Sequence, residues 1–529
     1  MTALASIPVQ INERWAEKVR VGLDPQCGRC EIECDTADLV EICAWLVDEL
    51  GYSFAGLIVE QEPSRWELRY VFYAAGPEAG WLYVLVHRPL AEPTFPSISA
   101  PVHAADWHER EAEDLFDLAF EGHPRLGDFV LHDDVWQEGI GPMRKDFDAS
   151  KPLLGRVPNA NWRPPRIVHA AGAFALPVGP IYSGIAESAQ FLLETVGEDV
   201  IRAYPRLFYK YRAVEKLAEG RSVEDALLLA ERFSATTAFA HALAFCQAAE
   251  SVCGIEVPAR AQVLRVLLAE LERFRHHAGA IQEICESTAL GVAASQAAIL
   301  EEDLLRLSCA LTRHRYLFGI AKIGGLARDF DDDVWCVALE WLHDILRRLE
   351  ALELSLRDSS SFLDRLEEVG IVSEQEARAF GLVGPVARAS GIARDLRKAQ
   401  PYAKYVDFVF DVPAEQEGDG YARLRILFAE ARQSVRIMEQ AIAALPTGPL
   451  QRLSVGIAPG AALGWAEAPR GATFHWLRIA NDGTVLRYRI VTPSFINWHG
   501  FHLAAEDFAF QDFPIILASF GLSVAENDR

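Results

Sequence analysis

The sequence predicts an α+β protein, in which a small α/β domain precedes a larger and mainly helical domain. Three observations predict this class. Runs rich in aromatic and β-branched residues occupy positions 54–88, and apolar residues recur with helical spacing through positions 223–445. Near the end of the chain, the turn signal Asn481-Asp482-Gly483 separates two alternating segments, which predicts a β-hairpin.

The chain has 529 residues, enough for about two to four domains. We expect a boundary near residue 147, because six prolines occur between residues 152 and 180 and their missing donors exclude a helix there. The predicted organisation is an α/β domain at 1–147, a Pro-rich connection at 148–180 and a large domain at 181–529.

In the first domain, the pattern predicts a helix at Thr36–Leu50 and strands at Phe54–Gln61, Trp66–Tyr73 and Trp81–Arg88. The Gly- and Pro-containing turn at 75–80 indicates a hairpin between the last two strands. Residues 106–147 are dense in charges and aromatic rings without a regular period, so we expect an extended docking segment.

In the large domain, the sequence predicts helices from Ser188 onward. Ser222 is the expected N-cap of one long apolar helical run, Val223–Cys253. Further helices are predicted at Ala259–Glu286, Ser295–Lys322, Val334–Arg357 and Tyr421–Leu445, and the hairpin strands at Thr473–Ile479 and Val485–Val491.

Composition narrows the function classes. The net charge of −24 argues against binding to nucleic acid or to anionic lipid. We expect no signal peptide and no direct membrane span, since no apolar run reaches ~18 residues. The sequence also contains no P-loop and no dinucleotide-binding glycine motif after a strand.

Nine cysteines are scattered along the chain, and the one cluster is Cys27, Cys30 and Cys34, with Cys43 nearby. Thiolates at this spacing could bind zinc or an iron–sulfur cluster, or they could be free thiols, and the sequence does not decide between these interpretations.

Two short stretches carry the most specific spacing. In the first, Ser234 and Thr237 stand three apart, with His241 four residues later; in the second, Ser523 and Glu526 stand three apart. With cysteine at these four positions, the stretches would be metal-ligand layouts. We therefore interpret them as a metal-site architecture from which the ligands are missing.

These landmarks resemble a known pair of subunits. Residues 106–147 resemble the small hydrophilic subunit of respiratory complex I, whose signature is E-R-E-x-x-D-x-F…G-H-P…D-D…R-K-D-[FY]. The matching residues are Glu109, Arg110, Glu111, Asp114, Phe116, Gly122, His123, Pro124, Asp133, Asp134, Arg144, Lys145, Asp146 and Phe147. Residues 178–529 resemble the large subunit of membrane-bound, energy-converting (group 4) [NiFe]-hydrogenases, which is homologous to the quinone-site subunit of complex I.

The resemblance implies a hydrogenase-related subunit that lacks the [NiFe] cysteines. The family's C-G-x-C-x-x-x-H motif falls on Ser234 and Thr237, and its D-P-C-x-x-C motif falls on Ser523 and Glu526. A hydroxyl does not replace a thiolate on nickel, so we expect no metal and no other cofactor bound by this chain. The complex I tyrosine falls near Ala235, and the loop of the quinone-binding histidine falls near residues 181–190, where Tyr182 is a candidate donor to quinone.

By resemblance, the expected partners are an iron–sulfur small subunit with one [4Fe–4S] cluster, a ferredoxin-like subunit and antiporter-like membrane subunits. The expected location is the cytoplasmic face of the cell membrane, reached through those partners. We hypothesise that charged residues near the former metal pocket couple a redox or binding event to ion translocation. The candidates are Glu187, Glu231, Arg232, His241, Arg470, Glu526 and Asp528.

Two alternatives stay open. The chain could be part of an oxidoreductase that reduces quinone or another acceptor with electrons from the partner's cluster. It could also be a non-catalytic scaffold whose pocket is filled by side chains, for which Phe233, Ala235 and Leu522 are the indications.

Overall fold

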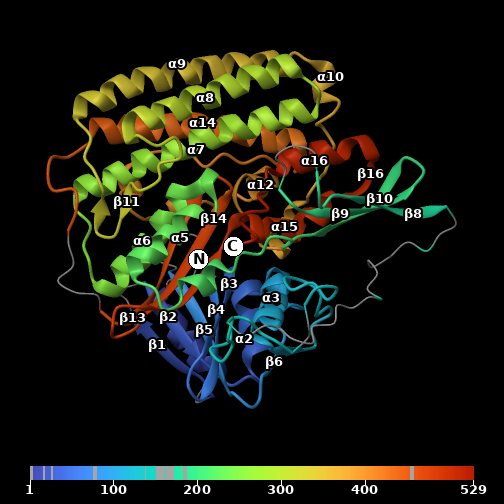
Figure 1. Cartoon of the computed structure of the whole chain (residues 1–529), viewed down its shortest axis with the longest axis vertical. Helices are drawn as coiled ribbons and strands as arrows, with labels where there is room; N and C mark the ends of the chain where they lie inside the picture. Colours follow the sequence, from blue (N-terminus) through green and yellow to red (C-terminus); the bar gives the residue numbers. More distant parts are fainter. Residues whose placement is uncertain are drawn as a thin grey trace.

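The computed structural model describes the chain except for residues 1–3, 16–17, 25–27, 75–79, 137–138, 151–160, 162–168, 170–171, 183–186 and 453–457. Figure 1 shows a bundle of long helices at one end of the molecule and the N-terminal sheet at the other, with α5, α6 and β14 between them. The predicted α+β class is confirmed.

The N-terminal sheet has five strands in the order β1-β2-β5-β4-β3. The predicted hairpin is confirmed, because β4 pairs antiparallel with β5, whereas β2 pairs parallel with β5. The strands are β1 (Arg20–Asp24), β2 (Arg29–Glu33), β3 (Ser53–Gln61), β4 (Arg65–Tyr73) and β5 (Trp81–Pro89). The helices of this part are α1 (Ile7–Trp15), α2 (Leu39–Asp48) and α3 (Asp106–Phe116), and the short strands β6 (Thr94–Pro96) and β7 (Ala119–Glu121) pair beside them.

The prediction of an extended segment at 106–147 was wrong at its start, because residues 106–116 form helix α3. The sequence showed no helical repeat of apolar residues here, because several of the buried positions of α3 carry charged side chains. Glu109, Arg110 and Glu111 are all at most 4% exposed, although charged residues normally mark the solvent face. Glu109 is held by Ser97 and by the backbone N–H of Ile98, so the carboxylate satisfies its hydrogen bonds inside the fold.

The prediction of helix from Ser188 onward was also wrong for the first 20 residues or so, which are strands. A four-stranded sheet, β16-β10-β9-β8, contains β8 (Ala173–Val178), β9 (Gln190–Val196), β10 (Asp199–Arg206) and β16 (Glu506–Ala509). The turn between β9 and β10 requires a positive φ, which Gly197 supplies at 69°. β8 lies within the Pro-rich stretch, most of which is outside the described residues.

The helices predicted at 259–286, 334–357 and 421–445 are confirmed as α7 (Ala259–Ser287), α9 (Asp332–Arg357) and α14 (Gly420–Ala443). The other helices of this part are α4 (Val214–Ala218), α5 (Val223–Arg232), α6 (Ala238–Cys253), α8 (Gly291–Thr312), α10 (Ser360–Leu363), α11 (Glu374–Ala379), α12 (Gly384–Ala389), α13 (Leu396–Ala399), α15 (Pro493–Ala504) and α16 (Phe513–Phe520). α8 ends ten residues before the predicted limit because Arg313 has a left-handed backbone, and residues 321–322 instead form β11 (Ala321–Lys322), paired with β12 (Gly325–Leu326).

The predicted helix at 223–253 is interrupted, which corrects the single run expected from its apolar content. α5 ends at Arg232, and Ser234 takes an extended backbone with φ −132° and ψ 97°. A 3-10 turn, η4 (Ala235–Thr237), then leads into α6. Ser222 is the N-cap of α5, as predicted, since its side chain accepts the N–H of Asp225.

The C-terminal hairpin is part of a three-stranded sheet, β13 (Gly460–Ala468), β14 (Gly471–Ile479) and β15 (Val485–Val491). α6 packs on this sheet, and β3 of the N-terminal sheet meets β14 and β15. Trp81 and Trp465 lie 4.8 Å apart between ring centroids, so the two sheets share one apolar core.

Buried ion pairs also join the helices of the bundle. Arg397 on α13 donates to Glu270 on α7, and Tyr405 and Ser434 donate to the same carboxylate. His277 on α7 lies 2.9 Å from Glu430 on α14. Within the described ranges, no helix has the length and apolar character needed to cross a membrane.

Candidate functional site

The two stretches singled out in the sequence meet in the structure. Ser234 and Thr237, on the turn between α5 and α6, lie against Glu526 near the end of the chain. The Ser234 and Thr237 hydroxyls are 2.8 Å apart, and Thr237 Oγ1 is 2.8 Å from Oε1 of Glu526. The two stretches that were singled out by their residue spacing, nearly 300 positions apart in the chain, therefore form one site.

Local backbone features bring these groups together. Glu272 of α7 accepts the N–H groups of Phe239 and Ala240, which fixes the first turn of α6 next to Thr237. At the other stretch, α16 ends at Gly521, whose φ of 59° turns the chain inward toward Glu526.

Glu526 is the centre of the cluster and is fully buried. Its Oε1 accepts from Thr237, more weakly from Ser234, and from Arg470 Nη1 at 3.2 Å. Its Oε2 accepts from the hydroxyl of Ser494 at 2.5 Å. Burial favours the neutral acid, but the positive charge of Arg470 and the hydrogen bonds keep the pKa of Glu526 below its ordinary value.

Arg470 occupies the turn between β13 and β14. Its Nη1 also donates to Thr236 Oγ1 at 3.0 Å, and its Nε donates to the carbonyl oxygen of Gly521. The backbone of this turn is pressed against α12, where a Cβ on Gly384 would lie only 2.0 Å from the carbonyl oxygen of Arg470. A glycine is required at that contact, and the contact fixes the guanidinium over the carboxylate.

Ser523 completes the second stretch. Its hydroxyl accepts the N–H of Glu526 at 3.3 Å, and its N–H donates to Ser494. The exposed Glu187 accepts the N–H groups of Val524 and Ala525, so this candidate anchors the C-terminal stretch from outside.

Asp528 follows Glu526 by two residues and contacts a different set of groups. Its Oδ2 accepts the N–H of Lys210, while Arg212 donates to its carbonyl oxygen and to that of Phe233. Burial raises the pKa of Asp528 to about 7, and these neighbours oppose the rise only partly.

Two candidates occupy the end of α5 and face a different segment. Glu231 is buried and accepts the N–H of Gly319 at 2.6 Å. Arg232 is largely exposed and lies over the ring of Phe318, 5.4 Å from its centroid. Both therefore contact the loop after α8 and not the Glu526 cluster.

Tyr182, the candidate quinone donor, is half-buried. Its hydroxyl donates to the carbonyl oxygen of Ala189 at 2.7 Å, within its own loop, and residues 183–186 of that loop are outside the described residues.

His241 is fully buried on α6 and faces Glu526, with Nε2 at 3.7 Å from Oε1. Its Nδ1 is 3.1 Å from Nε2 of His475 on β14. Sequence spacing did not single out His475 or Ser494, because both enter the site through tertiary packing. The one local signal for Ser494 was Thr492-Pro493, which starts α15 with Thr492 as its N-cap.

In the cysteine cluster, Cys27 lies outside the described residues. Cys30 and Cys34 are buried, and burial together with nearby carboxylates raises the pKa of each to about 12. Their thiols therefore stay protonated at neutral pH. Among the described residues, no group of three His, Cys, Asp or Glu side chains is arranged to hold a metal ion.

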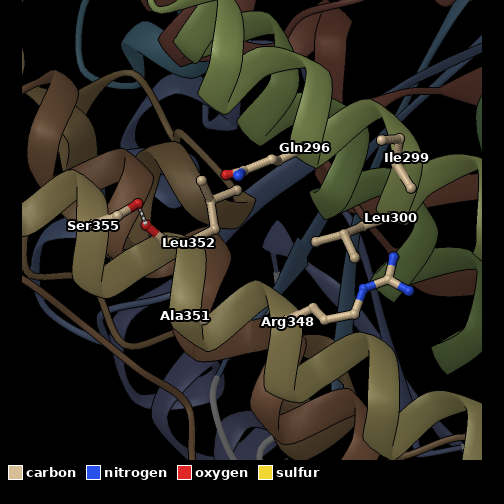
Figure 2. Close-up of a pocket in the computed structure, with 7 residues that line it drawn as sticks. All are labelled: Gln296, Ile299, Leu300, Arg348, Ala351, Leu352 and Ser355. Carbon is tan, nitrogen blue, oxygen red and sulfur yellow. Dashed lines mark hydrogen bonds between the residues drawn. The ribbon is translucent and has the colours of Figure 1, made fainter.

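A groove of about 470 Å³ lies on the helical bundle, between α8 and α9. Figure 2 shows Gln296, Ile299 and Leu300 on one helix facing Arg348, Ala351, Leu352 and Ser355 on the other. These residues come from neither of the two stretches, so the groove is distinct from the Glu526 cluster.

Comparison with known proteins places this geometry in a family. Residues 212–278, which include Ser234 and Thr237, match the family described as nickel-dependent hydrogenase. Residues 32–153 match the 30 Kd subunit of respiratory-chain NADH dehydrogenase, and residues 297–459 and 453–529 match its 49 Kd subunit. Formate hydrogenlyase subunit 5 of Escherichia coli (strain K12) is 31% identical over 468 residues, which cover 87% of this chain and 82% of the relative.

The chain belongs to the family of group 4 [NiFe]-hydrogenase large subunits and fused complex I C/D subunits. Other members agree with this assignment. Hydrogenase-4 component G of E. coli is 29% identical over 87% of this chain and 80% of its own length. The C/D subunit of NADH-quinone oxidoreductase from Bdellovibrio bacteriovorus is 33% identical over 65% of this chain and 62% of its own length.

Hydrogenases of this family carry a [NiFe] centre, and the residues of this chain do not fit one. Nickel in such a site needs soft thiolates, whereas Ser234, Thr237 and Ser523 supply neutral hydroxyls. The carboxylate of Glu526 is already neutralised by the guanidinium of Arg470, which would repel a metal cation. The residues of the two stretches thus form an ion pair and a set of hydroxyl contacts.

Proposed function

We propose that this chain is the peripheral-arm subunit of a membrane-bound, complex I-like and hydrogenase-related assembly, and that its degenerate metal site couples electron transfer or conformational change to ion translocation. Family membership supports the first part, because the named relatives are subunits of formate hydrogenlyase, hydrogenase-4 and NADH-quinone oxidoreductase. One observation carries the second part: a fully buried carboxylate, Glu526, bridges segments from four separate regions of the chain.

A buried charge pair responds strongly to any new charge nearby, because the low dielectric around it weakens screening. Glu526 holds the turn before α6 through Thr237, the β13–β14 turn through Arg470 and the start of α15 through Ser494. Removal of its charge would release three contacts together, which is the property that a coupling element needs.

The proposed partners follow from the family. They are an iron–sulfur small subunit with a [4Fe–4S] cluster as electron carrier, a ferredoxin-like subunit and antiporter-like membrane subunits. These would hold the chain at the cytoplasmic face of the cell membrane. Quinone is the proposed acceptor class if the complex delivers electrons to the membrane.

The test is ion transport by the assembled complex in sealed vesicles. We expect Glu526→Ala to reduce electron-linked ion transport by about tenfold or more while the subunits still assemble, since the pair is broken on one side only. Glu231→Ala removes the buried contact with Gly319 at the other end of the same turn and should weaken transport if the coupling extends to α5. Glu224→Ala, which removes an exposed carboxylate on the same helix, is the matched control. Unchanged transport in both the Glu526 and the Glu231 variants would rule out coupling through this site.

A scaffold role is the second candidate, and it also has an observation in its favour. Ser234, Thr237 and Glu526 are at most 2% exposed and satisfy one another's hydrogen bonds, as in a packed core. A scaffold predicts that Glu526→Ala lowers the yield of assembled complex and that transport per assembled complex is unchanged.

A further inference from the structure

Four buried groups form a row that leads away from the degenerate metal site. Glu526 Oε1 faces His241 Nε2 at 3.7 Å, and His241 Nδ1 faces His475 Nε2 at 3.1 Å. His475 Nδ1 in turn lies 2.7 Å from the hydroxyl of Tyr488. All four residues are fully buried, and they come from the C-terminal stretch, α6, β14 and β15.

The carboxylate at one end favours one set of hydrogen positions along the row. Oε1 of Glu526 lies 3.7 Å from His241 Nε2, beyond hydrogen-bond distance, but its negative charge favours the tautomer of His241 with hydrogen on Nε2, in which Nδ1 accepts. His475 must then donate from Nε2 to that Nδ1, which leaves its own Nδ1 to accept from the Tyr488 hydroxyl. Each ring has one arrangement that satisfies both of its neighbours.

The surroundings of His475 favour a neutral ring. Thr473 Oγ1 lies 3.3 Å from His241 Nδ1, but its hydroxyl donates to the carbonyl oxygen of Val491. Burial, then the proximity of His241 and Arg529, lowers the pKa of His475 well below its ordinary value. Aromatic rings flank both ends, with Phe233 4.5 Å from His241 and Phe245 5.3 Å from Tyr488 between centroids.

Beyond the last hydroxyl lies a second ionic group. Burial and then the negative charge of Glu215 raise the pKa of Tyr488. Glu215 accepts from Arg487 and Arg489, and Arg489 also donates to Glu111 of the N-terminal domain. The row therefore spans from the former metal site to the ion pairs at the junction with the N-terminal domain.

We propose that His241, His475 and Tyr488 are a proton relay that protonates and deprotonates Glu526 from the side of the Glu215 ion pairs. A proton that reaches the buried Tyr488 hydroxyl from solvent displaces hydrogen along the row, from Tyr488 to His475, from His475 to His241 and from His241 to Glu526. One proton enters, one carboxylate becomes a carboxylic acid, and both rings end neutral with hydrogen on Nδ1. No electron moves. The relay rests on the role of Glu526 in the proposed function.

The tautomers are measured by NMR on the full-length chain labelled with ¹⁵N in the histidine rings, with His241→Gln and His475→Gln used for assignment. At pH 8 we expect both rings to carry hydrogen on Nε2. In Glu526→Ala the acceptor is gone, and the Nε2–H share should fall at both rings together. The relay would be overturned if either ring of the wild-type chain carried hydrogen on Nδ1. It would also be overturned if the tautomer of His475 were the same in the wild type and in Glu526→Ala.

Tyr488→Phe gives a second and milder perturbation. We expect the His475 Nδ1 resonance to move toward that of an unbonded ring nitrogen, and ion transport by the assembled complex to slow by about tenfold or more. Tyr70→Phe is the matched control, since Tyr70 is also a fully buried strand tyrosine and its hydroxyl has no hydrogen-bond partner among the described residues. Normal transport in Tyr488→Phe with reduced transport in Glu526→Ala would reject the relay alone. Normal transport in both would reject the proposed function.

Discussion

The guanidinium of Arg529 donates to Glu111 Oε1 at 2.7 Å, which ties the C-terminal stretch to helix α3 of the N-terminal domain. Both residues are at most 2% exposed. Arg489 donates to the other oxygen of Glu111, and Glu215 lies beside both arginines. Buried carboxylates and guanidinium groups are thus paired directly where α3 meets the C-terminal stretch and β15.

Breaking this junction from one side should be costly. We expect Glu111→Gln to lower the free energy of unfolding by roughly 3 kcal/mol, because two buried guanidinium groups, Arg489 and Arg529, are left to share the single carboxylate of Glu215. Denaturant unfolding measures the change. Glu374→Gln removes the exposed pair with Arg378 and should cost less than about 1 kcal/mol. Equal effects in the two variants would show that the Glu111 cluster does not stabilise the fold.

The C-terminal stretch should loosen as the pH rises through neutrality. The folded pKa of Asp528, about 7, is above its ordinary value of 3.8, so its contribution to stability is fully present below pH 4 and is lost as the pH rises through 7. We expect hydrogen exchange at residues 524–528 to be faster at pH 8 than at pH 5, after correction for the intrinsic rate. The loss should be of order 1 kcal/mol per pH unit between pH 5 and 7.

Asp528→Asn is the control for that titration, because it keeps the side-chain shape and removes the charge. Protection of residues 524–528 in this variant should depend much less on pH. The same pH dependence in the variant and the wild type would assign the effect to another group.

The purified chain should bind no stoichiometric nickel. The Arg470 guanidinium pairs with Glu526 where a cation would lie, and the other donors are hydroxyls. Elemental analysis after growth with added nickel provides the measurement, and a hydrogen-uptake assay of the complex is the functional counterpart. One nickel per chain, or hydrogen uptake, would contradict the degenerate-site interpretation.

Thiol reactivity should separate the cysteines by burial. Cys309 and Cys336 are exposed, whereas Cys30 and Cys34 are buried with a pKa of about 12. Since the thiolate is the reactive form, iodoacetamide at pH 8 should label the exposed pair first. Mass spectrometry of tryptic peptides measures the order in which the cysteines are labelled. Early labelling of Cys30 or Cys34 in the native chain would show that the first domain opens readily.

The sequence could predict elements whose signal is local. The strands at 53–89, the long helices and the hairpin around Asn481-Asp482-Gly483 are set by periodicity and turn residues that lie close together in the chain. α3 and the strands at 190–206 were missed for the opposite reason. The residues Glu109, Arg110 and Glu111 are charged and yet buried. Their low hydropathy predicted exposure to solvent, whereas Glu109 forms its hydrogen bonds inside the fold.

The sequence by itself determined that Ser234, Thr237, Ser523 and Glu526 carry no thiol, because the side chain at each position is read directly from the chain, and their interpretation as former metal-ligand positions stays a prediction. It also determined which stretches would meet, through the three-residue spacing of Ser234 and Thr237 and of Ser523 and Glu526. Only the tertiary structure decided what surrounds them. Ser494 and His475 reach the site through contacts between segments far apart in the chain, and such contacts leave no periodic trace in the sequence. Arg470 was a candidate from the resemblance, but only the structure shows that it pairs with Glu526.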